Sequence, residues 1–187
     1  MLAMNHFFLA VFIIIGSGIL PLLFLWRRFV LMKAVASFGI TAGCLLGLID
    51  AVVKISHGAD VAASTSYLHA FTLAFRMDGL AAFFLIAIFL ISLLAAVYSY
   101  HYMDDAQKAV RVAVHYLFFS LLVASMALVV TAANMITFML CWEIMSLASF
   151  FLVVYNYEND GNRKAGFLYF IFSQVGAMVI LAAFGAV

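Results

Sequence analysis

Six long runs of apolar residues divide the chain, and each is long enough to cross a lipid bilayer. A transmembrane helix needs about 20 largely apolar residues to span a hydrocarbon core of about 30 Å. The runs are continuous rather than alternating, so they favour helices over a transmembrane barrel. The sequence therefore predicts an all-α integral membrane protein, with about six transmembrane helices in a single membrane domain, residues 1–187. The predicted spans are roughly residues 7–26, 33–53, 79–100, 112–132, 135–155 and 165–187.

The connection between the second and third spans has a different periodicity. Between Tyr67 and Met77, large side chains mostly alternate with smaller or polar ones. A period of two is typical of a strand, so we expect a short strand or β-hairpin on the extracytoplasmic membrane surface. Asp78 then directly precedes an apolar run, which predicts that Asp78 is the N-cap of the third helix.

The composition limits the classes of function that are open to this chain. Hydrophobic residues make up 69% of the 187 positions and charged residues 9%, against about 45–50% and 25% in soluble domains. These values exclude a water-soluble globular enzyme and a nucleic-acid-binding module. Cys44 and Cys141 both fall inside apolar runs, and the chain has no CxxC motif. We therefore expect no iron–sulfur cluster, zinc site or disulfide framework.

The basic residues are distributed unevenly between the two sides of the predicted bundle. The connections after the second and fourth spans contain only two basic residues, Lys54 and Arg76. Because basic residues concentrate on the cytoplasmic side, the richer side is predicted to be cytoplasmic and the N-terminus to lie outside. The basic residues on the richer side are Arg27, Arg28, Lys33, Lys108, Arg111, Arg163 and Lys164.

Glu143 is the one charged residue near the middle of a predicted span. An intramembrane acid faces a bundle interior or a hydrated cavity and marks a functional site by default. Helical spacing places Ser146 on the same face, where its hydroxyl is a possible hydrogen-bond partner of the carboxyl group. The alternative is a neutral glutamate that is hydrogen-bonded between helices for packing only. Ser173 and Gln174 in the sixth span are expected to form interhelical hydrogen bonds.

Two other polar features leave alternatives open. His101 and His115 end the third span and begin the fourth on the same side, so they are a possible pair of haem ligands. Solvated histidines at span ends need no such role, and this simpler interpretation is favoured over haem ligation. Asp50 lies near the outer end of the second span, where snorkelling or capping is favoured over transport.

The residues around Glu143 resemble a known family. The segment 142–153, Trp-Glu-Ile-Met-Ser-Leu-Ala-Ser-Phe-Phe-Leu-Val, is similar to the glutamate-bearing helix of the antiporter-like proton-pumping subunits. These subunits occur in respiratory complex I, Mrp-type antiporters and membrane-bound hydrogenases, and the similarity is greatest to hydrogenase-4 component B and the formate hydrogenlyase membrane subunit. Three further stretches agree in order with the family's helix entries and exits: residues 75–83, 98–103 and 165–170.

The resemblance implies a larger helical bundle, of which this chain is the N-terminal portion. In the family, a fold of roughly fourteen helices contains two inverted five-helix repeats. Glu143 then corresponds to the glutamate that pairs with a lysine of the seventh helix, and the chain ends before that helix. The expected location is the bacterial or archaeal cytoplasmic (inner) membrane. The expected partners are the lipid bilayer and other subunits of a multi-subunit redox complex.

The function that follows is proton translocation driven by redox chemistry in those other subunits, with Glu143 as the proton relay and no cofactor in this chain. The chain would be a membrane subunit of an oxidoreductase that is not itself redox-active. One alternative is an Mrp-type cation/proton antiporter subunit, in which sodium takes part. A second is the haem-bearing membrane anchor, and a third is a purely structural segment that packs against other subunits.

Overall fold

The computed structural model describes residues 2–25, 28–57, 61–67, 71–104 and 106–186. Within this part of the chain, six helices are long and apolar enough to cross a membrane. The predicted all-α membrane fold with about six transmembrane helices is thereby confirmed. The helices are α1 (Leu2–Leu20), α2 (Phe29–His57), α3 (Gly79–Tyr102), α4 (Ala109–Thr131), α5 (Met135–Val153) and α6 (Asp160–Gly185).

In the described part of the chain, three short helical turns adjoin these helices, each next to a connection. A π-helical turn, Pro21–Leu25, follows α1, and 3₁₀ turns at Ala106–Lys108 and Val154–Asn156 precede α4 and follow α5. The first turn begins at the chain's one proline. Proline has no backbone N–H to donate to the preceding turn, which accounts for the change of helical type at this point.

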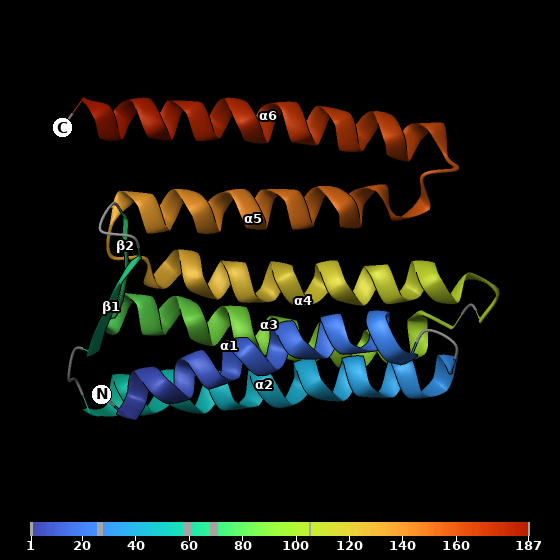
Figure 1. Ribbon diagram of the computed structural model, residues 1–187, viewed down its shortest axis with the longest axis horizontal. Helices are drawn as coiled ribbons and strands as arrows, with labels where there is room; N and C mark the ends of the chain where they lie inside the picture. The colour runs from blue at the N-terminus through green and yellow to red at the C-terminus, as the bar shows by residue number, and fades with distance from the viewer. Residues whose placement is uncertain (1, 26–27, 58–60, 68–70, 105, 187) are drawn as a thin grey trace.

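The six helices lie side by side with their long axes nearly aligned (Figure 1). α2 packs between α1 and α3, α4 packs against α1 and α3, and α5 and α6 continue the row beyond α4. In the most apolar stretch of each helix, 44% of residues are buried for α4 but only 6% for α6. The core therefore lies among α1 to α4, and α6 forms an edge.

Close helix contacts in the core depend on glycine. A Cβ atom added at Gly43 of α2 would lie 2.4 Å from Cγ1 of Ile14 in α1. A Cβ atom at Gly47 would lie 2.5 Å from the ring of Phe89 in α3. Small residues of this kind let neighbouring helix backbones approach closely in a membrane. Both contacts fix α2 between its two neighbours.

A β-hairpin connects α2 to α3. Its strands β1 (Val61–Tyr67) and β2 (Phe71–Met77) pair antiparallel, with Val61 opposite Met77. Of the two forms expected, a strand or a hairpin, the structure has the hairpin, and the alternating pattern that suggested it covers β2 and only the last residue of β1. Asp78 follows β2 and caps α3, because its carboxylate accepts a hydrogen bond of 2.8 Å from the Ala81 N–H. That bond lowers the pKa of the Asp78 carboxyl group below its ordinary value.

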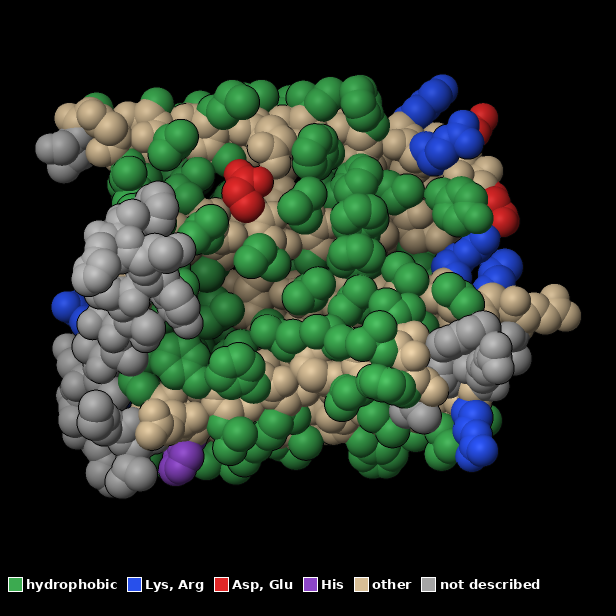
Figure 2. Space-filling view, viewed as in Figure 1, with side chains coloured by type: hydrophobic (Ala, Val, Ile, Leu, Met, Phe, Trp, Pro, Cys, Tyr) green, Lys and Arg blue, Asp and Glu red, His purple; other side chains and the backbone are tan. Residues whose placement is uncertain are grey.

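The two ends of the bundle differ in charge. Most lysine and arginine side chains gather at the end that holds the connections α1–α2, α3–α4 and α5–α6, which we call the basic end (Figure 2). The opposite end holds the hairpin and the α4–α5 connection, and we call it the hairpin end. Arg27, one of the basic residues counted for orientation, lies outside the described residues.

One ion pair of the basic end is partly buried. The Lys33 ammonium lies 2.7 Å from Oδ1 of Asp104 and close to two aromatic rings, 5.1 Å from the Phe29 centroid and 5.0 Å from the Tyr100 centroid. The Lys33 side chain is 8% exposed, whereas that of Asp104 is 73% exposed. The pair links the start of α2 to the α3–α4 connection.

Candidate functional site: an acidic contact between α5 and α6

Glu143 lies near the middle of α5, half-buried against α6. Its Oε2 atom accepts a hydrogen bond of 3.1 Å from the side-chain amide of Gln174. Figure 2 shows acidic surface at the boundary of α5 and α6, within a face that is otherwise largely apolar. The acid is thus held by a polar contact between two helices that are apolar along most of their length.

Ser146 lies one helical turn beyond Glu143 and is 1% exposed. Its hydroxyl is 2.5 Å from the hydroxyl of Ser173. The sequence suggested Glu143 itself as the partner of Ser146, whereas the structure pairs Ser146 with α6. Since Ser173 and Gln174 are adjacent, the two contacts form consecutive polar links between α5 and α6. The interhelical role expected for Ser173 and Gln174 is what the structure shows.

The contact with Gln174 is compatible with both protonation states of Glu143. An ionised carboxylate only accepts hydrogen bonds, whereas a protonated carboxyl group keeps one acceptor oxygen and gains a donor. The Gln174 amide N–H can therefore donate to Glu143 before and after a proton is bound. Gln174 fixes the position of the acid without fixing its charge.

The neighbouring residues make the surroundings of this contact apolar. Trp142 stacks on Phe138 with ring centroids 5.7 Å apart, and its buried indole N–H has no hydrogen-bond partner. Among the described residues Glu143 forms no ion pair. The buried lysines Lys33 and Lys54 lie near the two ends of α2 rather than beside α5.

The two histidines of the haem alternative lie in separate surroundings. His115 packs among aromatic rings, with centroids 5.7 Å from Tyr116 and 5.4 Å from Tyr155. The exposed His101 lies against Tyr100 instead. No ring contact or hydrogen bond joins the two histidines in the part of the chain that is described. The described residues also contain no group of three or more potential metal ligands.

Asp50 has a neighbour that sequence reasoning missed. Its Oδ1 atom lies 3.9 Å from Nδ1 of His6 in α1, its side chain is 12% exposed, and its Oδ2 atom is buried without a hydrogen-bond partner. The pairing depends on how α1 packs against α2, for which the sequence has no local signal. Asp50 lies toward the hairpin end of α2, and its neighbour His6 belongs to α1 rather than to α5 or α6.

A second missed feature is an ion pair at the basic end. Arg111 of α4 donates a hydrogen bond of 2.9 Å to Glu158 and one of 3.2 Å to the Tyr157 hydroxyl. The Arg111 hydrogen bond lowers the pKa of the Glu158 carboxyl group. Both residues follow α5 in sequence, so the pair ties α4 to the α5–α6 connection. Counting charges for orientation gave no indication of this pairing.

Comparison with known protein families identifies the fold and the region around Glu143. Residues 64–111 match the family model described as NADH-ubiquinone oxidoreductase (complex I), chain 5 N-terminus. Residues 132–187, which include Glu143 and Gln174, match the model described as NADH:quinone oxidoreductase/Mrp antiporter, TM. The chain belongs to the antiporter-like family of membrane subunits. The resemblance inferred from the sequence is confirmed.

Individual relatives come from several branches of this family. Over 154 residues the chain is 30% identical to hydrogenase-4 component B of Escherichia coli (strain K12), covering 81% of this chain and 23% of that protein. Over 110 residues it is 33% identical to the putative antiporter subunit mnhA2 of Staphylococcus saprophyticus, covering 59% of this chain and 14% of that protein. The chain thus matches less than a quarter of the length of either relative.

A solved structure shares the same fold. A chain of the membrane-bound sulfane sulfur reductase, an archaeal respiratory membrane complex, superposes with a TM-score of 0.71 at 23% identity. The match covers 95% of this chain and 27% of that one. The arrangement of all six helices is therefore one that occurs within a larger membrane subunit.

Proposed function

We propose that the chain forms part of a proton-translocating antiporter-like subunit, with Glu143 as an intramembrane proton relay. The subunit would serve a hydrogenase-4-like or complex I-like energy-converting oxidoreductase. The observation that carries the proposal is the position of Glu143, in the middle of α5 with Gln174 as its hydrogen-bond partner.

The energetic cost of that position supports a functional role. A charged residue at the centre of a membrane helix costs about 2.5–3.5 kcal/mol on insertion scales. If the only role were to join two helices, a pair of serines would do so at a lower free-energy cost, as Ser146 and Ser173 do one turn away. A carboxyl group that can gain and lose a proton while Gln174 holds it in place is suited to proton transfer.

Relay function needs a basic group that couples to Glu143. When two ionisable groups interact strongly, each proton affinity depends on the charge of the other, and a proton can pass between them. Among the described residues no base forms an ion pair with Glu143, so we assign the coupled base to another part of the assembly. Redox chemistry is likewise assigned to partner subunits, with this chain contributing the proton path.

The proposal is tested by Glu143→Gln in the intact complex, with proton uptake measured in inverted membrane vesicles. Glutamine retains the hydrogen-bonding shape but cannot release a proton, so we expect uptake to fall at least tenfold while assembly is unchanged. Asp160→Asn is the matched control, because Asp160 is an exposed acid at the start of α6 that pairs with Arg163. Normal uptake in a fully assembled Glu143→Gln complex contradicts the relay role.

An Mrp-type antiporter subunit is the second candidate function. The 33% identity to an antiporter subunit favours it, and the same glutamate would serve both activities. Transport that requires sodium and proceeds without a redox partner supports this candidate over the first. A Soret absorption band in the purified protein would instead support the alternative that the chain is a haem-bearing membrane anchor.

A further inference from the structure

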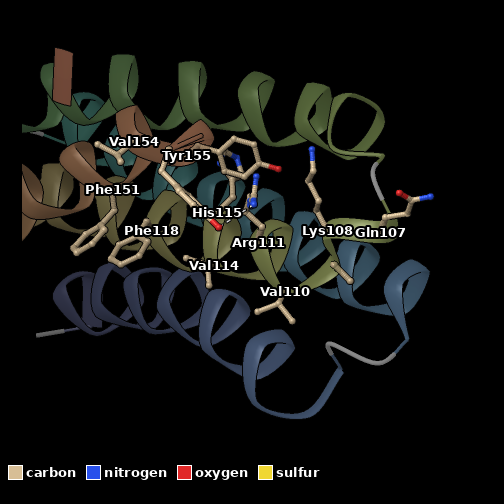
Figure 3. Close-up of a pocket in the computed structure, with 12 residues that line it drawn as sticks. Gln107, Lys108, Val110, Arg111, Val114, His115, Phe118, Phe151, Val154 and Tyr155 are labelled. Carbon is tan, nitrogen blue, oxygen red and sulfur yellow. Dashed lines mark hydrogen bonds between the residues drawn. The ribbon is translucent and has the colours of Figure 1, made fainter. Parts of the chain in front are cut away.

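A groove with a volume of about 840 Å³ opens between α4 and α5 at the basic end (Figure 3). Small-molecule sites typically have volumes of about 300–1,000 Å³. The groove plays no part in the proposed proton relay, since Glu143 and Gln174 do not line it. Its lining combines basic side chains at one end with aromatic and aliphatic ones along its length.

The polar end of the groove is built around Arg111. Lys108 and Gln107 lie beside it on the turn that leads into α4 (Figure 3). Both hydrogen bonds of Arg111, to Glu158 and Tyr157, use the Nη2 atom. A guanidinium group carries five N–H donors in a planar fork, so hydrogens on Nε and Nη1 are available to a further acceptor. Arg111 can therefore bind an anionic oxygen while it stays paired with Glu158.

The apolar part of the groove runs along α4 toward the middle of that helix. Phe118 and Phe151 stack with ring centroids 4.2 Å apart and join α4 to α5. Val110 and Val114 line the same groove. Phe118 lies seven residues after Arg111, which is about 10 Å along a helix. An occupant that fits both parts has an anionic head and a hydrocarbon tail.

We propose that this groove binds one anionic phospholipid. Its phosphate lies at Arg111 and Lys108, and one acyl chain runs past Val114 toward Phe118 and Phe151. The site lies at the ends of membrane-spanning helices, which is the level of lipid headgroups. Basic pockets between transmembrane helices recognise anionic headgroups, and each lysine or arginine near the surface strengthens binding about fivefold.

The test is photo-crosslinking in the membrane, using the intact assembly. A photoreactive benzoylphenylalanine replaces Val110, whose side chain is exposed and lines the groove. Mass spectrometry of the peptide that contains position 110 then identifies what is captured. We expect phospholipid adducts in which phosphatidylglycerol is enriched several-fold over its share of the bulk membrane. Capture of a protein segment, or of lipids in their bulk proportions, overturns the proposal.

Two further variants separate headgroup binding from a merely structural role of Arg111. Arg111→Gln should lower phosphatidylglycerol capture about fivefold, while Arg163→Gln, at the same end but outside the groove lining, leaves it unchanged. Glu158→Gln removes the ion pair but keeps the cation, so capture should be retained or increased. If Glu158→Gln lowers capture as much as Arg111→Gln, Arg111 only holds the connection in place and the proposal is wrong.

Discussion

At the scale of single residues, the sequence identified the acid but not its partner. Glu143 stood out because it is the one charge near the middle of a span. Helical spacing correctly placed Ser146 on the same side, yet Ser146 bonds to Ser173. Which residue of α6 meets Glu143 depends on the register between two helices. That register is set by packing over their whole length, so no local pattern shows that Gln174 is the one.

If Gln174 positions the carboxyl group, Gln174→Leu should slow proton uptake roughly tenfold. Hydrogen bonds to charged groups contribute about 1.5–3 kcal/mol, and about 1.4 kcal/mol corresponds to a factor of ten in rate. Ser173→Ala is the control, because it changes the neighbouring residue and leaves the Glu143 contact intact. The measurement is proton uptake in vesicles. Equal uptake rates for Gln174→Leu and Ser173→Ala would show that Gln174 contributes to helix packing and not to proton transfer.

At the scale of elements, the hairpin was predictable but its attachment was not. Alternating side chains and the cap at Asp78 are local signals, and both led to structures that are present.

The hairpin also binds the α4–α5 connection. The Ala74 N–H donates to the Thr137 hydroxyl at 3.0 Å, the Ala133 N–H donates to the Ala74 carbonyl at 2.8 Å, and the Asn134 amide donates to the Thr72 carbonyl. These contacts join segments about 60 residues apart, beyond the reach of any periodicity.

Thr137→Val should loosen the hairpin from α5. Valine matches threonine in shape but lacks the oxygen that accepts from the Ala74 N–H, and Thr137 is fully buried. A buried donor left without an acceptor costs about 1–3 kcal/mol. Hydrogen exchange of residues 71–77 should therefore accelerate about fivefold or more. Thr41→Val is the control, since the Thr41 hydroxyl bonds only within its own helix. Unchanged exchange in Thr137→Val would mean that the backbone contacts hold the hairpin alone.

At the scale of the whole molecule, composition predicted the class of fold but not the location of its core. All six helices are strongly apolar. Lipid tails are as apolar as leucine, so hydrophobicity does not distinguish a side chain that faces lipid from one that faces another helix. Glycines mark some of the helix contacts but not all positions: Gly43 and Gly47 lie at tight contacts of α2, whereas Gly176 of α6 has no neighbouring atom within 4 Å of an added Cβ. Large apolar side chains of α6, such as Phe172 and Met178, are exposed.

The arrangement of charges at the two ends leads to a prediction of orientation. Positive residues concentrate on the cytoplasmic side of membrane proteins, so the basic end should face the cytoplasm and the hairpin end the outside. Arg76→Cys and Asp160→Cys place thiols at opposite ends, at positions whose side chains are 58% and 76% exposed. The native Cys44 and Cys141 are buried and should react little. In intact cells, a membrane-impermeant maleimide should label Arg76→Cys at once and Asp160→Cys only after permeabilisation. The reverse order would place the N-terminus inside and the opening of the Arg111 groove in the outer leaflet. The lipids captured at position 110 would then have to be compared with the composition of the outer leaflet.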